Sequence, residues 1–236
     1  MELFFVLAAS LLPAILLLLY IWKKDPQKEP TSQLVKAVVY GVAICIPVAI
    51  LEGGIDAWLF GPGEASSIID TTIQAFFVAA LPEEACKLLV LWLVLRKNPY
   101  FDEHFDGIVY AVCVGLGFAA IENVFYVLGE GEGWMSVAVT RALLAVPGHY
   151  AFAILMGYYY SVYHFVDHSS KIAACVLLVP VLAHGIYDAL ALSGTVNPFV
   201  GVLGFFVLIY FCIRMHKFAN RKVIALIKKD VENQVA

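Results

Sequence analysis

The sequence predicts an all-α protein, a polytopic bundle of transmembrane helices. Of its 236 residues, 62% are hydrophobic and only 14% are charged, and the mean hydropathy is +0.85. These values lie outside the usual range of soluble domains. A helix needs roughly 20 apolar residues to cross a hydrocarbon core of about 30 Å, and about seven such stretches lie between short polar breaks. We therefore expect one integral membrane domain over residues 1–236.

The apolar stretches define the expected helices in order along the chain. The expected spans are 3–22, 34–58, 68–95, 107–128, 135–163, 171–193 and 196–216. The first begins with an acidic residue and has no basic residue before its apolar run, so we expect a retained helix and not a signal peptide. Residues 217–236 form a basic tail, either an amphipathic helix on the membrane surface or a frayed end.

Lysine and arginine are distributed unevenly between the breaks. They follow the first, third, fifth and seventh spans: Lys23, Lys24, Lys28, Arg96, Lys97, Lys171, Arg214, Lys217, Arg221 and Lys222. The other breaks, GPGEASSIID, GEGEG and SGTVN, contain neither. The positive-inside rule then predicts an external N-terminus and a cytosolic C-terminus. Nothing in the sequence supports nucleic-acid binding. The five cysteines all fall in apolar spans, so no disulfide framework is expected.

Ionisable residues interrupt four consecutive spans. They are Glu83, Glu84 and Lys87 in the third, Glu122 in the fourth, His149 in the fifth, and His184 and Asp188 in the sixth. Each costs roughly 2.5–3.5 kcal/mol at the bilayer centre on insertion scales, so each needs a partner or a function. Their positions within the spans predict one cluster at or just outside the midplane, toward the outer face.

Helical spacing predicts how these side chains pair. Glu83 and Lys87 are four residues apart, as are His184 and Asp188, so each pair shares a helix face. Glu84 lies about 100° round the helix from Glu83, so the two need not share a partner. Prolines accompany three of these helices, Pro82, Pro147 and Pro180. The resulting kinks predict a hydrated pocket.

The remaining polar residues are expected to be solvated or to anchor helix ends. These are Glu52, Asp56, Asp102, His104, Asp106, Arg141, His164, Asp167 and His168. Gly115 and Gly117 are expected to permit close helix approach rather than ligand contact. Packing alone also remains an explanation for either ion pair of the cluster.

Carboxylates and histidines without a serine or cysteine nucleophile indicate hydrolysis by activated water. A buried Glu83 beside Glu84 can act as a general base, with Lys87 keeping one carboxylate ionised. A histidine can donate to the oxyanion, and Asp188 can orient His184. We expect no cofactor, although His149, His184, Asp188 and Glu122 are acceptable zinc ligands and zinc stays open, without an HExxH motif. Two further alternatives are a proton-coupled transporter and a non-catalytic receptor or scaffold.

Four short motifs, in this order on successive spans, resemble the PrsW family of intramembrane proteases. They are EEACK (83–87), FAAIEN (118–123), PGHYAF (147–152) and HGIYD (184–188). More distantly, the chain is similar to the CAAX prenyl endopeptidases and bacteriocin-processing proteins. In those families arginine and histidine occupy the positions of Lys87 and Glu122, which argues against a prenylated substrate.

The resemblance also implies a biological role. It implies a multi-pass protease of the bacterial cytoplasmic membrane that performs site-one cleavage of a single-span anti-sigma factor. The cut would fall on the extracytoplasmic side, and the partners would be this substrate and the membrane lipid. The displacement of the polar cluster toward the outer face agrees with cleavage on that side.

Overall fold

The computed structural model describes residues 2–61 and 66–235, and no strand occurs within them. The α-helices are α1 (Glu2–Lys24), α2 (Thr31–Ala43), α3 (Cys45–Phe60), α4 (Ile68–Ile73), α5 (Leu81–Leu95), α6 (Asp106–Gly129), α7 (Trp134–Thr140), α8 (Val146–Phe165), α9 (Ser170–Val196) and α10 (Pro198–Val235). Two π-helical segments, η1 (Gln74–Ala80) and η3 (Arg141–Ala145), and one 3₁₀ turn, η2 (Gly131–Gly133), complete the list. The all-α expectation is confirmed. All five cysteines are free.

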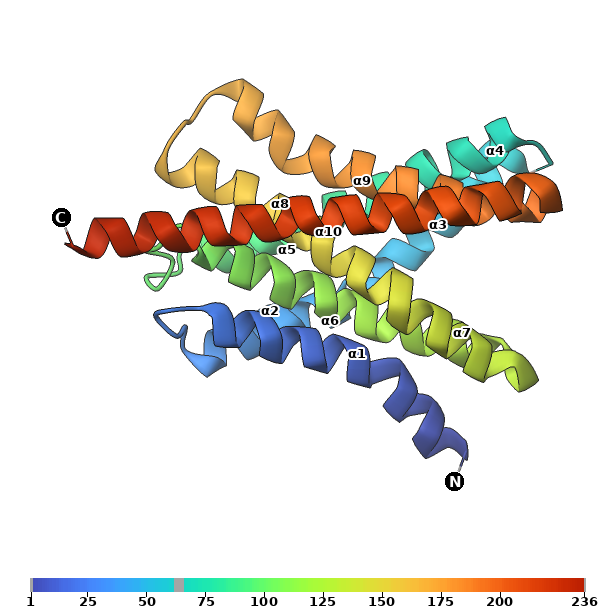
Figure 1. Cartoon of the computed structure of the whole chain (residues 1–236), viewed down its shortest axis with the longest axis horizontal. Helices are drawn as coiled ribbons and strands as arrows, with labels where there is room; N and C mark the ends of the chain where they lie inside the picture. Colours follow the sequence, from blue (N-terminus) through green and yellow to red (C-terminus); the bar gives the residue numbers. More distant parts are fainter. Residues whose placement is uncertain (1, 62–65, 236) are drawn as a thin grey trace.

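Six stretches of the described chain are long and apolar enough to cross a membrane. They are Leu3–Lys24, Thr31–Phe60, Asp106–Gly129, Gly131–Phe165, Ser170–Val196 and Pro198–Glu232. The continuous helical run α4–η1–α5 is comparable in length but is not among the six by composition, because it carries Glu83, Glu84 and Lys87. The two termini lie at opposite ends of the bundle (Figure 1). The chain is thus a multi-pass membrane protein.

Helix α6 is the centre of the bundle and packs against α1, α2 and α8. Glycines allow this close approach. A Cβ atom added at Gly115 would lie 2.8 Å from the Cβ of Ala153 on α8, and one at Gly117 would lie 2.4 Å from the carbonyl oxygen of Val38 on α2. The expected packing role of Gly115 and Gly117 is confirmed.

Two of the three prolines in the polar spans directly follow π-helical turns. The N–H of Leu81, just before Pro82, donates to the carbonyl of Phe76, and the N–H of Val146, just before Pro147, donates to that of Arg141. Both bonds reach back five residues, as in a π-helix, and the proline that follows donates no hydrogen bond because it has no N–H. The wider turns rotate the side chains of Glu83 and His149 relative to a regular helix.

The C-terminal tail is helical, so the expected alternative of a frayed end is wrong. Residues 217–235 continue α10 without a break, and Val223 and Leu226 are buried against the bundle. Asp230 is also buried, and its carboxylate accepts hydrogen bonds from the backbone N–H groups of His104 (2.9 Å) and Phe105 (2.8 Å). The tail therefore packs along the bundle and holds the segment just before α6.

His104 was expected to be solvated, and this was wrong. Its side chain is buried, and its Nδ1 lies 2.6 Å from Asp230 Oδ1. The imidazole therefore has a hydrogen-bond partner, which lies 126 positions later in the chain.

Candidate active site

A cavity of about 570 Å³ lies between α3, η1–α5, α6, η3–α8 and α9. Its polar lining consists of Glu52, Gln74, Glu83, Glu122, Thr140, Arg141, His149, His184 and Asp188. The lining includes the start of η1 next to α4, the end of α7 and the C-terminal part of α9, and these elements lie on the side of the bundle that carries the N-terminus (Figure 1), so the cavity extends toward that end. The structure thus brings the polar residues of four successive spans together around one space.

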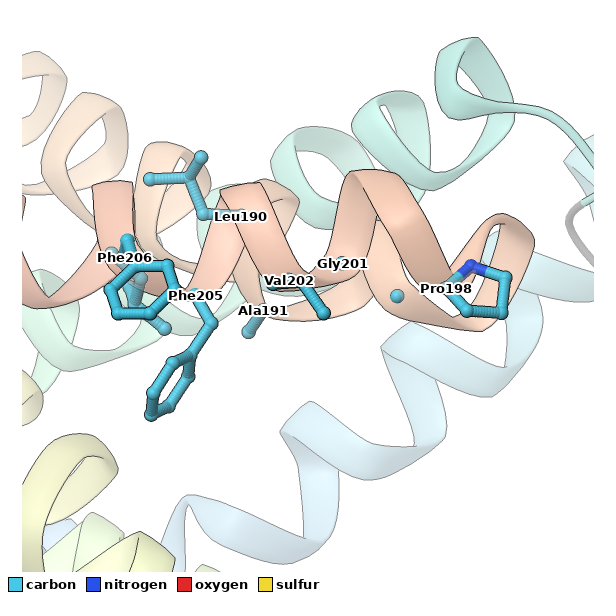
Figure 2. A pocket seen from close by; sticks show the side chains of 9 residues that line it. Leu190, Ala191, Pro198, Gly201, Val202, Phe205 and Phe206 are labelled. Carbon is cyan, nitrogen blue, oxygen red and sulfur yellow. The ribbon is translucent and has the colours of Figure 1, made fainter.

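A second hollow, of about 430 Å³, lies at the turn between α9 and α10. Figure 2 shows only apolar side chains around it, among them Leu190, Val202, Phe205 and Phe206. It contains no ionisable group and offers no catalytic chemistry.

Lys87 stands at the centre of the polar residues. Its Nζ donates to Glu83 Oε2 and to Glu84 Oε1, both at 2.8 Å, and lies 3.2 Å from His149 Nδ1. It also lies 4.3 Å from the ring centre of Phe118. Glu83, Glu84 and Lys87 are all at most 4% exposed. One buried cation therefore neutralises part of the charge of two buried carboxylates, as such groups require.

His184 lies between two carboxylates. Its Nδ1 is 3.0 Å from Glu84 Oε1 and its Nε2 is 3.1 Å from Asp188 Oδ2. Phe152 stacks on the imidazole, with the ring centres 4.6 Å apart. Because both ring nitrogens face carboxylate oxygens, which only accept, this geometry favours the doubly protonated imidazolium.

His149 is held in a similar way on the other side of the centre. Its Nε2 lies 2.8 Å from Glu122 Oε2, and its Nδ1 points inward to Lys87. Arg141 donates from Nη2 to the same Glu122 oxygen (2.8 Å) and from Nε to Asn123 Oδ1 (2.8 Å). Glu122 therefore orients the histidine, and Arg141 orients Glu122.

The donor set fits a divalent metal such as zinc. One ligand atom from each of Glu83, Glu84, His149 and His184 lies within 4.8 Å of the others. Both histidines present Nδ1 inward and direct Nε2 to an outer carboxylate, the arrangement that orients metal-bound histidines. Glu84 Oε2 is buried and has no hydrogen-bond partner in the described chain. In this structure the Lys87 ammonium holds the inner donors together.

Glu83 and Glu84, which were not required to share a partner, both contact Lys87, because positions three and four before it flank it on the helix surface. One expectation for this region was wrong. Arg141 does not anchor a helix end at the membrane surface but contacts the candidate catalytic residues.

Glu52, expected near an outer helix end, also lines the cavity. The sequence alone could have singled out both Arg141 and Glu52. Arg141 is a basic residue at the expected outer end of a span, where lysine and arginine are otherwise rare, and Glu52 interrupts an apolar span.

The fold and the site define a class: a polytopic membrane enzyme with a buried centre of carboxylates and histidines. Residues 29–213 match the family model described as PrsW family intramembrane metalloprotease. The chain belongs to the PrsW family, and its activity is therefore that of an intramembrane peptide hydrolase.

Curated proteins named Protease PrsW are similar to this chain over most of their length. The protein from Oceanobacillus iheyensis is 35% identical over 184 residues, which cover 78% of this chain and 81% of that protein. The protein from Clostridioides difficile is 34% identical over 76% of each chain. The protein from Bacillus subtilis is 31% identical, over 78% of this chain and 82% of its own. No solved structure matches this chain significantly.

Proposed function

We propose that this protein cleaves a membrane-anchored protein with a water molecule that Glu83 activates. The proposal rests on one observation: Glu83 and Glu84 occupy different positions relative to the cavity. Glu83 lines the cavity, where water and substrate can reach it, whereas Glu84 and Lys87 lie behind it. A buried carboxylate at hydrogen-bond distance from a water is a competent general base.

The other residues have supporting roles in this proposal. Lys87 stabilises the two carboxylates in their ionised form. His184, held between Glu84 and Asp188, carries protons on the cavity wall and can donate one to the oxyanion of the tetrahedral intermediate. Glu122 fixes the orientation of His149, and Arg141 fixes that of Glu122.

A metal is the second candidate route, because the donor set fits one and the matching family model is described as a metalloprotease. Glu84, His149 and His184 would hold the ion, with Glu83 still the base. A zinc ion supplies Lewis-acid activation of water and stabilises developing negative charge. Activity lost on chelation and restored by zinc would assign this chemistry to the site, and activity retained in chelator with metal-free protein would assign it to glutamate alone.

We propose that the substrate is a single-span anti-sigma factor of the bacterial cytoplasmic membrane, cut at site one on the extracytoplasmic side. The resemblance of the four motifs supports this. So does the extension of the cavity toward the N-terminal end, which the distribution of lysine and arginine predicts to be external.

The test uses purified protein and a candidate single-span substrate in proteoliposomes. We expect two fragments with one new N-terminus, identified by mass spectrometry, and none with Glu83→Gln. A proton-coupled transporter built on the same polar cluster would leave the substrate intact and acidify the vesicle lumen instead.

A further inference from the structure

A second buried acidic group lies at the end of the bundle opposite the active-site opening. Asp25 and Glu29 belong to the loop between α1 and α2, and Glu103 and Asp106 lie where the chain enters α6. Both segments lie at the end of the molecule that carries the C-terminus (Figure 1). One carboxylate oxygen from each of Asp25, Glu103 and Asp106 lies within 4.8 Å of the others. The reaction proposed above uses none of these residues.

Backbone groups hold these carboxylates in place. Asp106 Oδ2 accepts from the N–H groups of Asp102 (3.1 Å) and Glu103 (2.7 Å), and Asp25 Oδ1 accepts from that of Gln27 (3.1 Å). The side-chain amide of Gln27 donates to Glu103. The acids are therefore preorganised and not merely clustered by composition.

Two buried oxygen atoms of this group lack donors. Asp25 is 2% exposed and Asp106 is fully buried, yet Asp25 Oδ2 and Asp106 Oδ1 have no hydrogen-bond partner within the described residues. A buried acceptor without a partner costs about 1–3 kcal/mol, and more when it is charged. Both atoms belong to the side chains whose oxygens converge, so they point to a missing positively charged ligand.

Lys28 is the basic residue beside this group, and its charge acts on Asp25. Its ammonium donates to the backbone carbonyls of Trp22 (2.6 Å) and Asp25, however, and not to a carboxylate. The Tyr110 hydroxyl donates to Glu29.

We propose that Asp25, Glu103 and Asp106 bind a hard divalent cation of the Mg²⁺ or Ca²⁺ class. Such cations prefer carboxylate and carbonyl oxygens, whereas zinc prefers nitrogen and sulfur, and the three convergent donors are all oxygens. The bound ion joins the loop after α1 to the start of α6. It therefore clamps the central helix at the end remote from the peptidase cavity.

The direct test is isothermal titration of MgCl₂, and separately of CaCl₂, into detergent-purified protein stripped with EDTA. We expect saturable binding by the wild-type protein and a rise in its unfolding temperature with cation concentration, since a ligand that binds the folded state stabilises it. Asp106→Asn should lose both responses. Asp102→Asn, which changes an exposed neighbour, should keep them.

A third variant separates this site from the active site. Glu84→Gln removes a candidate catalytic donor, so it should keep the Mg²⁺ or Ca²⁺ response if binding occurs at Asp25, Glu103 and Asp106. The proposal is overturned if wild-type protein shows no saturable binding of either cation. It is equally overturned if Asp106→Asn binds as wild type does, or if Glu84→Gln alone abolishes binding. If Asp106→Asn does not fold, Asp25→Asn replaces it, and the wild-type titration remains decisive.

Discussion

Glu83 and Glu84 are adjacent in the chain and bond to the same ammonium, but they face different surroundings. Glu84 is fully buried and contacts His184, whereas Glu83 reaches the cavity. Identical side chains can therefore have different roles, one as a proton acceptor and one as a fixed charge. Substitution of each by the isosteric amide distinguishes these roles.

Glu83→Gln should insert and fold but lose cleavage, because glutamine preserves the shape and cannot accept a proton from water. Removal of a general base typically costs about 10²–10⁴-fold in rate. The measurement is the initial rate of fragment formation in proteoliposomes, with protein amount and thermal unfolding measured in parallel. Glu132→Gln, an exposed change at the same end of the bundle, is the control. Near-normal turnover by Glu83→Gln would refute the assignment.

His184→Ala should reduce activity more than stability, and Asp188→Asn should reproduce part of that loss. The reason is that asparagine keeps a contact to Nε2 but no longer holds a proton there by charge. Comparison of rates per folded molecule checks this. If both variants fail to accumulate in the membrane while their unfolding temperatures collapse, the pair serves packing and not catalysis.

At the level of elements, the π-helical turns and the long α10 shape the site and its support. The turns before Pro82 and Pro147 set the direction in which Glu83 and His149 leave their helices. Far from the cavity, α10 extends past its membrane span and places Asp230 against the backbone N–H groups of His104 and Phe105, just before α6. Without such a partner these buried N–H groups would be unsatisfied.

Asp230→Ala should destabilise the protein without affecting the chemistry. Loss of this carboxylate leaves the N–H groups of His104 and Phe105 and the buried His104 side chain without their partner, and a buried polar group without a partner costs about 1–3 kcal/mol. Unfolding in detergent should show the loss, while the cleavage rate per folded molecule stays normal. Glu232→Ala removes an exposed i,i+4 pair with Lys228 and should change stability by less than about 0.5 kcal/mol. Equal stabilities of the two variants would contradict a stabilising role for the Asp230 carboxylate.

At the level of the whole molecule, the two polar centres lie toward opposite ends of the bundle. The peptidase cavity extends toward the end with the N-terminus, and the acidic group of Asp25, Glu103 and Asp106 lies toward the other. Water must therefore reach Glu83 from the N-terminal side. This geometry predicts where a substrate is cut.

The scissile bond should lie in an extended or frayed stretch at or just beyond the extracytoplasmic end of the substrate span. Inside a transmembrane helix the backbone carbonyls are already hydrogen-bonded and shielded from attack. Helix-breaking Gly or Pro introduced at this point should increase cleavage, and extension of the helix with Leu and Ala should block it. Mass spectrometry of the fragments is the measurement. A cut in the cytoplasmic half of the substrate span would contradict both the orientation and the position of the site.

Local properties of the sequence were sufficient for the membrane class, for six of the expected membrane-crossing helices and for the main polar residues. A run of about 20 apolar residues has one stable environment in a bilayer, so span limits follow from composition. An ionisable side chain within such a run is costly wherever it lies, and this cost alone singles out Glu83, Glu84, Lys87, Glu122, His149, His184 and Asp188. Spacing of four residues was also enough to pair His184 with Asp188.

The tertiary structure alone decided how the helices are rotated and which distant residues meet. Arg141 reaches Glu122 and Asn123 because α7 and α8, on either side of η3, pack against α6, and Asp230 reaches His104 because α10 continues along the bundle. Asp25 lies beside Asp106 because the loop after α1 and the start of α6 meet in the folded chain. Contacts of this kind depend on helix packing over long sequence separations. Hydropathy and periodicity describe only the environment and one face of a single helix, so they contain no information about which neighbour that face meets.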